Sequence, residues 1–159
     1  MSKKTIIVFS GEYDRLMAAF IIANGAAAMD DEVTMFFTFW GLSALRKEKQ
    51  PAVVEKKVSG LQKMFSGMLP KNAEKLPISK FNFAGAGRVM MKKVMKSENV
   101  MTVAELIETA QEQGIKMIAC TMSMDVLGIA KEELIDGIEY AGVATYLGEA
   151  DEANVNLFI

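Results

Sequence analysis

Hydrophobic residues occur in short unbroken runs at several places along this chain. The runs at residues 5–10, 32–40 and 115–119 contain β-branched, aromatic and other apolar side chains without polar alternation. Such runs predict strands that are covered on both faces, as in the interior of a parallel sheet. A shorter run at residues 137–140 is compatible with a fourth strand, and the alternating run at 154–159 with a strand at an edge.

Between these runs, apolar residues recur at the three- and four-residue spacing of amphipathic helices. The helix that begins after Thr102 has the clearest start, because Glu105 completes a capping-box pattern, and Gly114 ends it. A short helix at residues 124–130 is predicted after the third strand. The other helical segments are predicted at residues 13–29, 42–46, 52–64, 89–95 and 142–150.

Strands that alternate with helices pair in parallel through right-handed crossovers. The chain, residues 1–159, is therefore predicted to form one α/β domain. Its sheet has about five mostly parallel strands with helices on both faces, in the layered arrangement of flavodoxin-like folds. Residues 46–80 are the most polar part and contain all three prolines, so we interpret them as an insertion within this domain.

Lysines are scattered over the predicted insertion. Such a group of charges is most often a solvated face; the alternative is a docking surface for an acidic partner protein, whose approach the charges would steer. The sequence alone leaves both interpretations open. The lysines concerned are Lys47, Lys49, Lys56, Lys57, Lys63, Lys71, Lys75 and Lys80.

Composition and charge exclude several classes of function. The net charge is -2, and no basic stripe with interleaved aromatic residues is present, so nucleic acid is not expected as a partner. The apolar run near the N-terminus is too short for a signal peptide, and no helical segment is apolar over the roughly 20 residues that a membrane span requires. We therefore expect a cytoplasmic protein without a membrane span.

The chain contains no histidine and one cysteine. Without an imidazole, the Ser-His-Asp and Cys-His catalytic arrangements and histidine-based metal sites are excluded. Neither Gly-x-Gly-x-x-Gly nor Gly-x-x-x-x-Gly-Lys-Ser/Thr follows the first strand, so no nucleotide-binding fingerprint is present. We expect neither a metal ion nor a cofactor.

Cys120 follows the apolar run 115–119 directly and precedes the short helix. In an open α/β sheet, sites form at the carboxyl ends of strands, where the next helix offers free N–H groups and the positive end of its dipole. These groups favour a thiolate, so Cys120 is the candidate catalytic residue. The alternative is that a single cysteine is a small packing residue, since cysteine is among the most buried residue types.

Three residues after the cysteine are candidates for supporting its thiolate. The N–H groups of Met122, Ser123 and Met124 lie at the predicted helix start, and Ser123 is expected to cap the helix rather than to donate to sulfur. Methionine fills gaps in protein cores, which is the default role for both methionines. The alternative is that they form an adaptable apolar rim around the thiol.

Two other strand ends are expected at the same edge of the sheet as the cysteine, and the residues after them are candidates for lining a pocket. These residues are Ser10, Gly11, Trp40 and Gly41. Arg88 follows a glycine-containing stretch and is a candidate for holding an anion. A flexible loop before a surface helix is the plainer interpretation of that stretch.

Residues 119–129, Ala-Cys-Thr-Met-Ser-Met-Asp-Val-Leu-Gly-Ile, resemble the cysteine motif of the DsrE-like (DsrE/DsrF/DsrH-like) sulfurtransferase family. The first strand, Thr-Ile-Ile-Val-Phe-Ser, and the second, Glu-Val-Thr-Met-Phe-Phe-Thr-Phe-Trp-Gly-Leu, are also similar to this family. The resemblance covers essentially the whole chain. It implies a small α/β fold that assembles into homo-oligomers, commonly trimers or hexamers.

The resemblance also implies a role in sulfur metabolism, in which a cysteine carries a persulfide and exchanges its outer sulfur with TusA-like or rhodanese-like proteins. Only Cys120 can be assigned this role here, and the role predicts that its thiol is open to solvent. Sulfur transfer proceeds between thiolates and needs neither a histidine nor a metal ion. The leading hypothesis is therefore a cytoplasmic persulfide carrier or sulfurtransferase.

Two hypotheses from other classes remain open. The chain is a non-catalytic small-molecule-binding or regulatory subunit if its site is the predicted pocket at the strand ends. It is a redox sensor if the same thiol reacts with peroxide faster than with persulfide donors.

Overall fold

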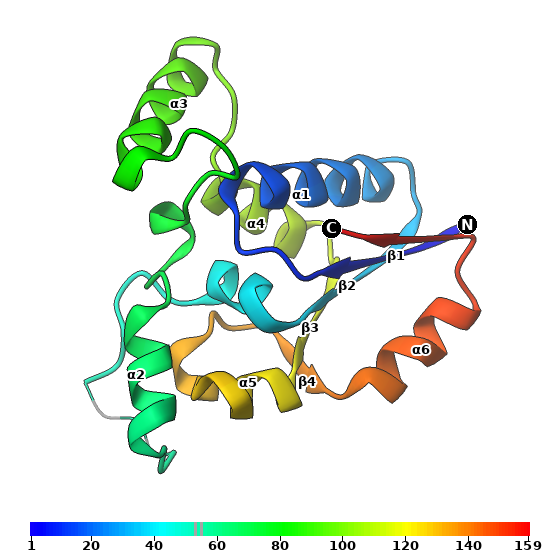
Figure 1. The fold of residues 1–159 in the computed structure, drawn as a ribbon. Helices are drawn as coiled ribbons and strands as arrows, with labels where there is room; N and C mark the ends of the chain where they lie inside the picture. Colours follow the sequence, from blue (N-terminus) through cyan, green and yellow to red (C-terminus); the bar gives the residue numbers. More distant parts are fainter. Residues whose placement is uncertain (53, 55) are drawn as a thin grey trace.

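A computed structural model describes residues 1–52, 54 and 56–159 of the chain. Its centre is a five-stranded sheet of order β4-β3-β2-β1-β5 in which every neighbouring pair is parallel (Figure 1). The predicted α/β fold with a parallel sheet is confirmed. The strands are β1 (Lys3–Val8), β2 (Glu32–Phe37), β3 (Lys116–Cys120), β4 (Glu139–Ala141) and β5 (Val155–Phe158).

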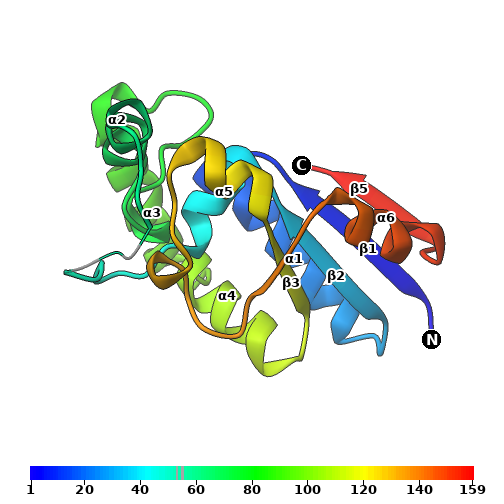
Figure 2. The same ribbon diagram turned by 90° about the horizontal axis from the view of Figure 1, so that it is seen from below.

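The two faces of the sheet are covered by different helices. Helices α1 (Tyr13–Ala27) and α4 (Val103–Glu112) pack on one face and enclose the main apolar core there. The predicted capping box of α4 is present, because Thr102 Oγ1 accepts from the N–H of Glu105 and the Glu105 carboxylate accepts from the N–H of Thr102. Helix α6 (Val143–Asp151) covers the other face, which is turned toward the viewer in Figure 2.

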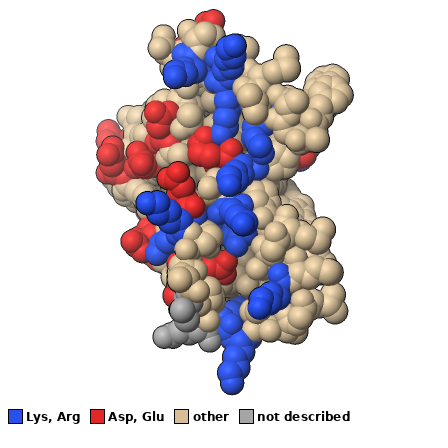
Figure 3. Space-filling model, turned by 90° about the vertical axis from the view of Figure 1, so that its left-hand side faces the viewer, with Lys and Arg blue, Asp and Glu red and all other residues tan. Residues whose placement is uncertain are grey.

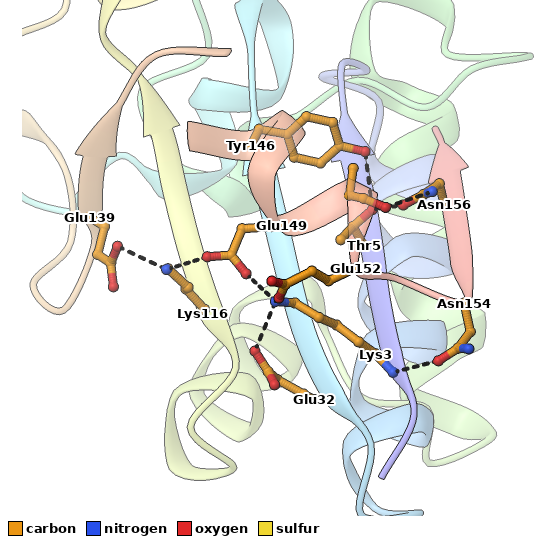
Figure 4. A network of polar contacts seen from close by, with 11 residues as sticks. Lys3, Thr5, Glu32, Lys116, Glu139, Tyr146, Glu149, Glu152, Asn154 and Asn156 are labelled. Carbon is orange, nitrogen blue, oxygen red and sulfur yellow. Dashed lines mark hydrogen bonds and ion pairs between the residues drawn. The ribbon is translucent and has the colours of Figure 1, made fainter. Parts of the chain in front are cut away.

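The face under α6 is apolar at one end and ionic at the other. At the carboxyl end of the strands, Phe36, Ile118 and Cys120 pack against Tyr146 of α6. At the amino end, Glu149 of α6 lies 2.7 Å from the ammonium groups of both Lys3 and Lys116 (Figure 4). These contacts hold α6 against the sheet from both ends.

We expect Glu149→Gln to lower the melting temperature by a few degrees at neutral pH. Hydrogen bonds from Lys116 and Lys3 hold the pKa of the Glu149 carboxyl below its ordinary value, and the same contacts raise the pKa values of both lysines. A carboxyl with a lowered pKa in the folded protein contributes stability above its unfolded pKa of about 4.3 and loses it as the pH falls through the folded pKa.

The difference between wild type and Glu149→Gln should therefore be largest at neutral pH and disappear in acid, as thermal melts over a pH series would show. Glu139→Gln is the matched control, because this more exposed carboxylate lies 3.5 Å from Lys116 and should matter less. A difference that is the same at acid and neutral pH would contradict the expectation.

The second strand ends earlier than residue 40, where the sequence places its end. Phe39 has a left-handed φ of 47° and begins a 3₁₀ helix, Phe39–Leu45, which also replaces the helical turn predicted at 42–46. The Gly41 N–H donates to the carbonyl of Phe9, and a Cβ at Gly41 would collide with the carbonyl of Val8. The close approach of the two strand ends turns the chain out of the sheet.

Two predicted helices are also displaced. The helix expected at 52–64 is α2 (Gly60–Met68), which begins at a capping box formed by Ser59 and Gln62; residues 53 and 55 of the predicted range lie outside the described residues. The helix expected at 124–130 is α5 (Thr121–Leu127), which follows β3 without a turn. In both cases the apolar spacing indicated a helix, but its ends lie elsewhere: α2 begins at its capping box, and α5 ends where Gly128 adopts a left-handed conformation.

Helices α2 and α3 (Ala86–Ser97) stand beside the sheet (Figure 1). No residue of α2 is buried, and α3 buries Met95. Figure 3 shows Lys and Arg side chains in a column along this side of the molecule, with uncharged surface on one side of the column and Asp and Glu side chains on the other. The large apolar side chains exposed on these two helices are Leu61, Met64, Phe65, Met68, Val89, Met90 and Val94.

A buried ion pair joins the segment before α2 to the segment before β4. Arg46 donates to the Glu133 carboxylate at 2.8 Å, and both side chains are buried. Arg46 also donates to the carbonyl of Pro70 at 3.2 Å, while Glu133 accepts from the N–H of Ala130. The pair therefore connects three loops that are distant in the sequence.

Over the described residues, no helix is long and apolar enough to cross a membrane.

Candidate functional site

Cys120 is the last residue of β3 and is paired in the sheet with Ala141 of β4. Its position at the carboxyl end of a central strand is the one that the sequence predicts. Its side chain points to the face under α6, where it packs with Phe36, Ile118 and Tyr146. Cys120 is 3% exposed, so the expectation that its thiol is open to solvent is wrong for this conformation.

The ring of Tyr146 forms part of the cover over the thiol. It stacks on Phe36 with the ring centroids 5.1 Å apart, and its hydroxyl lies 3.1 Å from Thr5 Oγ1. Thr5 also hydrogen-bonds Asn156 of β5 (Figure 4). Tyr146 therefore contacts β2 through Phe36 and β1 through Thr5, and the Thr5 hydroxyl links this contact to β5.

Ser123 does not cap the helix after the cysteine, because α5 already begins at Thr121. Cys120 occupies the N-cap position, and its side chain makes no capping hydrogen bond. Ser123 is buried, and its hydroxyl pairs with that of Thr38 at 2.8 Å, which joins α5 to the end of β2. Ser123 was expected either to cap the helix or to donate to sulfur. Its hydroxyl instead contacts Thr38 at the neighbouring strand end.

The two methionines that follow Cys120 have different surroundings. Met124 is buried in the main core, in a different group of apolar residues from the one that contains Cys120. Met122 is exposed on α5, close in sequence to the cysteine. Met124 therefore packs as core methionines do, and Met122 is the one available to a docking protein.

Three of the predicted pocket residues, Ser10, Gly11 and Trp40, line one cavity of about 410 Å³. Gly41 is buried and does not line it, and Arg88 lies on α3, where it donates to the carbonyl of Lys75 at 2.7 Å. Neither Cys120 nor the turn after it lines this cavity. The cavity and the cysteine are therefore two separate sites at the strand ends, and not the single pocket that the sequence suggests.

Sequence reasoning missed three polar residues of the cavity wall, Glu12, Arg15 and Ser43. Glu12 and Arg15 could have been found from their places directly after Gly11 and one turn into the first helix. Ser43 gave no signal, because its position depends on the 3₁₀ helix that replaced the end of the predicted strand.

Among residues 1–52, 54 and 56–159, no three His, Cys, Asp or Glu side chains gather in a way that could hold a metal ion.

These features define a small α/β protein with a parallel five-stranded sheet and a cysteine at the carboxyl end of a central strand. The chain belongs to the DsrE/DsrF/DrsH-like family, whose model matches residues 1–158. The resemblance to this family that the sequence indicates is thereby confirmed.

Two relatives match nearly the whole chain. The uncharacterized protein YrkE of Bacillus subtilis (strain 168) is 58% identical over 157 residues, which cover 99% of this chain and 96% of that protein. The sulfur carrier protein DsrE2 of Allochromatium vinosum is 37% identical over 161 residues, which cover 99% and 98%.

Two solved structures share the fold. The ychN protein from E. coli superposes with a TM-score of 0.58 at 13% identity over 100% of both chains. Protein MTH1491 from Methanobacterium thermoautotrophicum superposes with a TM-score of 0.52 at 12% identity over 99% of each. At these identities the likeness shows the fold alone.

Proposed function

We propose that this protein carries sulfane sulfur as a persulfide on Cys120 and passes it between protein partners in the cytoplasm. The observation that carries the proposal is the location of the chain's single cysteine at the carboxyl end of β3, in a chain 37% identical to a protein named as a sulfur carrier. Family membership over residues 1–158 supports the same role in sulfur trafficking.

The chemistry needs two exchanges at one sulfur atom. The Cys120 thiolate attacks the outer sulfur of a donor persulfide; a new S–S bond forms, the donor's S–S bond breaks, and the electron pair leaves with the donor thiolate. An acceptor thiolate then attacks the outer sulfur on Cys120, and the Cys120 thiolate leaves. Each exchange conserves electrons and protons, so neither an oxidant nor a metal ion takes part.

Burial of the thiol adds a condition to this mechanism. Cys120 is 3% exposed within the apolar group that contains Tyr146, so a thiolate of the partner reaches the sulfur only after a local opening, which we place at α6. Docking of the donor or acceptor supplies the free energy for this opening only if the partner binds the open form more tightly. Sulfur exchange is then fastest with proteins that dock beside the cysteine.

The charge distribution supports a docking side for acidic partners. Between residues 56 and 97 there are ten Lys or Arg and one Asp or Glu, whereas the rest of the chain has eight and nineteen. This basic segment contains α2 and α3, and α2 meets α5 where Gln62 donates to the carbonyl of Asp125 at 2.6 Å. TusA-like and rhodanese-like proteins are the partners we propose, with a homo-oligomer, a trimer or hexamer, as the working assembly.

Intact-protein mass spectrometry after brief exposure to polysulfide, and separately to thiosulfate-loaded rhodanese, tests the proposal. We expect the wild-type protein to gain the mass of one or more sulfur atoms and to lose it again with a thiol reductant. Cys120→Ser should gain nothing. Uptake by Cys120→Ser, or no uptake by wild type from either donor, would contradict the carrier function.

The two other hypotheses give different results in the same experiment. A redox sensor would form a sulfenic acid or an intersubunit disulfide with peroxide faster than it gains sulfur. A binding subunit would show a thiol that stays unreactive to both reagents while a small molecule binds elsewhere.

A further inference from the structure

The cavity of about 410 Å³ at the ends of β1 and β2 has the size and place of a small-molecule site. Such sites commonly measure about 300–1,000 Å³, and in open α/β sheets they lie outside the carboxyl ends of the strands. Its lining includes Phe9, Ser10, Glu12, Arg15, Trp40 and Ser43.

One wall contains a buried hydroxyl with no partner. Ser43 is 1% exposed, and its Oγ has no hydrogen-bond partner in the described part of the chain. A buried polar group left unpaired destabilises the folded protein, and a ligand atom that bonds to the Ser43 hydroxyl would remove this cost.

The aromatic wall is held by a tight backbone arrangement. Phe39 has a left-handed φ, a conformation that is costly for a residue with a side chain and is concentrated at functional sites. Gly11 lies so close to the next strand end that a Cβ would be 2.7 Å from the carbonyl oxygen of Trp40. Trp40 is 41% exposed and lines the cavity together with Phe9.

The polar side of the cavity carries an anion of its own. The Glu12 carboxylate accepts from the Arg15 guanidinium at 2.8 Å and from the Ser10 hydroxyl at 3.2 Å. Glu12 precedes the first residue of α1, the 15-residue helix whose N-terminus favours negative charge. Its side chain makes no capping hydrogen bond to that helix.

We propose that this cavity binds a small aromatic carboxylate, a function distinct from sulfur transfer at Cys120. The ring lies against Trp40 and Phe9. The carboxylate replaces that of Glu12 on Arg15, beside the N-terminus of α1, and Ser43 donates its free hydroxyl to a ligand oxygen. Glu12 therefore acts as a competitor that the ligand displaces into solvent.

Trp40 is the only tryptophan in the sequence, so its fluorescence reports directly on the cavity. The probe is 3-phenylpropionate, compared with the neutral 3-phenylpropionamide and the non-aromatic 3-cyclohexylpropionate. We expect a saturable change in emission with 3-phenylpropionate. The affinity for each of the other two compounds should be lower by roughly three- to tenfold, because the amide loses the charge-assisted hydrogen bond and the cyclohexyl acid loses the aromatic contact.

Substitutions at the polar side make the test specific. Glu12→Gln should tighten binding of 3-phenylpropionate severalfold, because it removes the competing carboxylate, and Arg15→Gln should abolish the preference for the acid over the amide. Arg88→Gln on α3 and Cys120→Ser are controls that should leave binding unchanged. The proposal is overturned by the absence of a saturable change, by equal affinities for acid and amide, or by weaker binding in Glu12→Gln.

Discussion

Glu133→Gln is expected to lower the free energy of unfolding by roughly 3–5 kcal/mol, the range measured when one partner of a buried ion pair is removed. Arg46 would then keep its charge in a buried position without a carboxylate at 2.8 Å. Its hydrogen bonds to the carbonyls of Ser66 and Pro70 remain but do not neutralise it. Urea unfolding followed by circular dichroism measures the change.

Two variants separate the charge from the packing. The double variant Arg46→Met/Glu133→Leu should recover much of the loss, since it removes both charges and keeps apolar volume. Asp125→Asn is the matched control, because Lys56 and Asp125 form an ion pair at 2.6 Å with an exposed carboxylate, and such pairs contribute about 1 kcal/mol or less. Equal losses for Glu133→Gln and Asp125→Asn would show that burial of the Arg46 pair has no special effect.

The second large effect is expected at Cys120. Tyr146→Ala should increase the rate of alkylation of the folded protein by iodoacetamide on the order of tenfold or more, which corresponds to lowering the free energy of local opening by about 1.4 kcal/mol or more. The reason is that Tyr146 packs directly on the apolar group that contains the thiol. The label, followed by intact mass, must go to Cys120, since the chain has no other cysteine.

Tyr146→Phe keeps the ring and removes only the hydroxyl near Thr5, so it should stay close to wild type. Leu147→Ala changes an exposed residue on the same helix and controls for a general loosening of α6. If wild type reacted as fast as the unfolded protein, the thiol would not be protected in solution, and the proposed requirement for opening during sulfur transfer would fail with it.

Much of the fold follows from local patterns. Unbroken apolar runs separated by amphipathic helices predict a parallel sheet, because a strand buried on both faces and followed by a helix pairs in parallel with the next such strand. Thr102 and Glu105 predict the start of α4 because a capping box involves residues three apart. Cys120 at the carboxyl end of β3 follows from the same reasoning, since the apolar run stops there.

The boundaries that failed depended on distant contacts. The second strand stops at Phe37 because Gly41 packs against Val8 of the neighbouring strand, and no pattern within residues 32–40 contains that information. Serine is a typical N-cap residue, yet the Ser123 hydroxyl forms a hydrogen bond with Thr38 at the end of the neighbouring strand.

By itself, the sequence determined the order of strands and helices along the chain, the parallel sheet and the edge at which the cysteine lies, because these follow from the apolar spacing within each segment and from the way a strand, a helix and the next strand pack together. Only the tertiary structure decided that Tyr146 covers the thiol, that Arg46 and Glu133 are buried together, and that Ser43 faces a cavity. Each of these contacts joins segments far apart in the chain. Their free energies come from burial and desolvation, which exist only after the layers have packed.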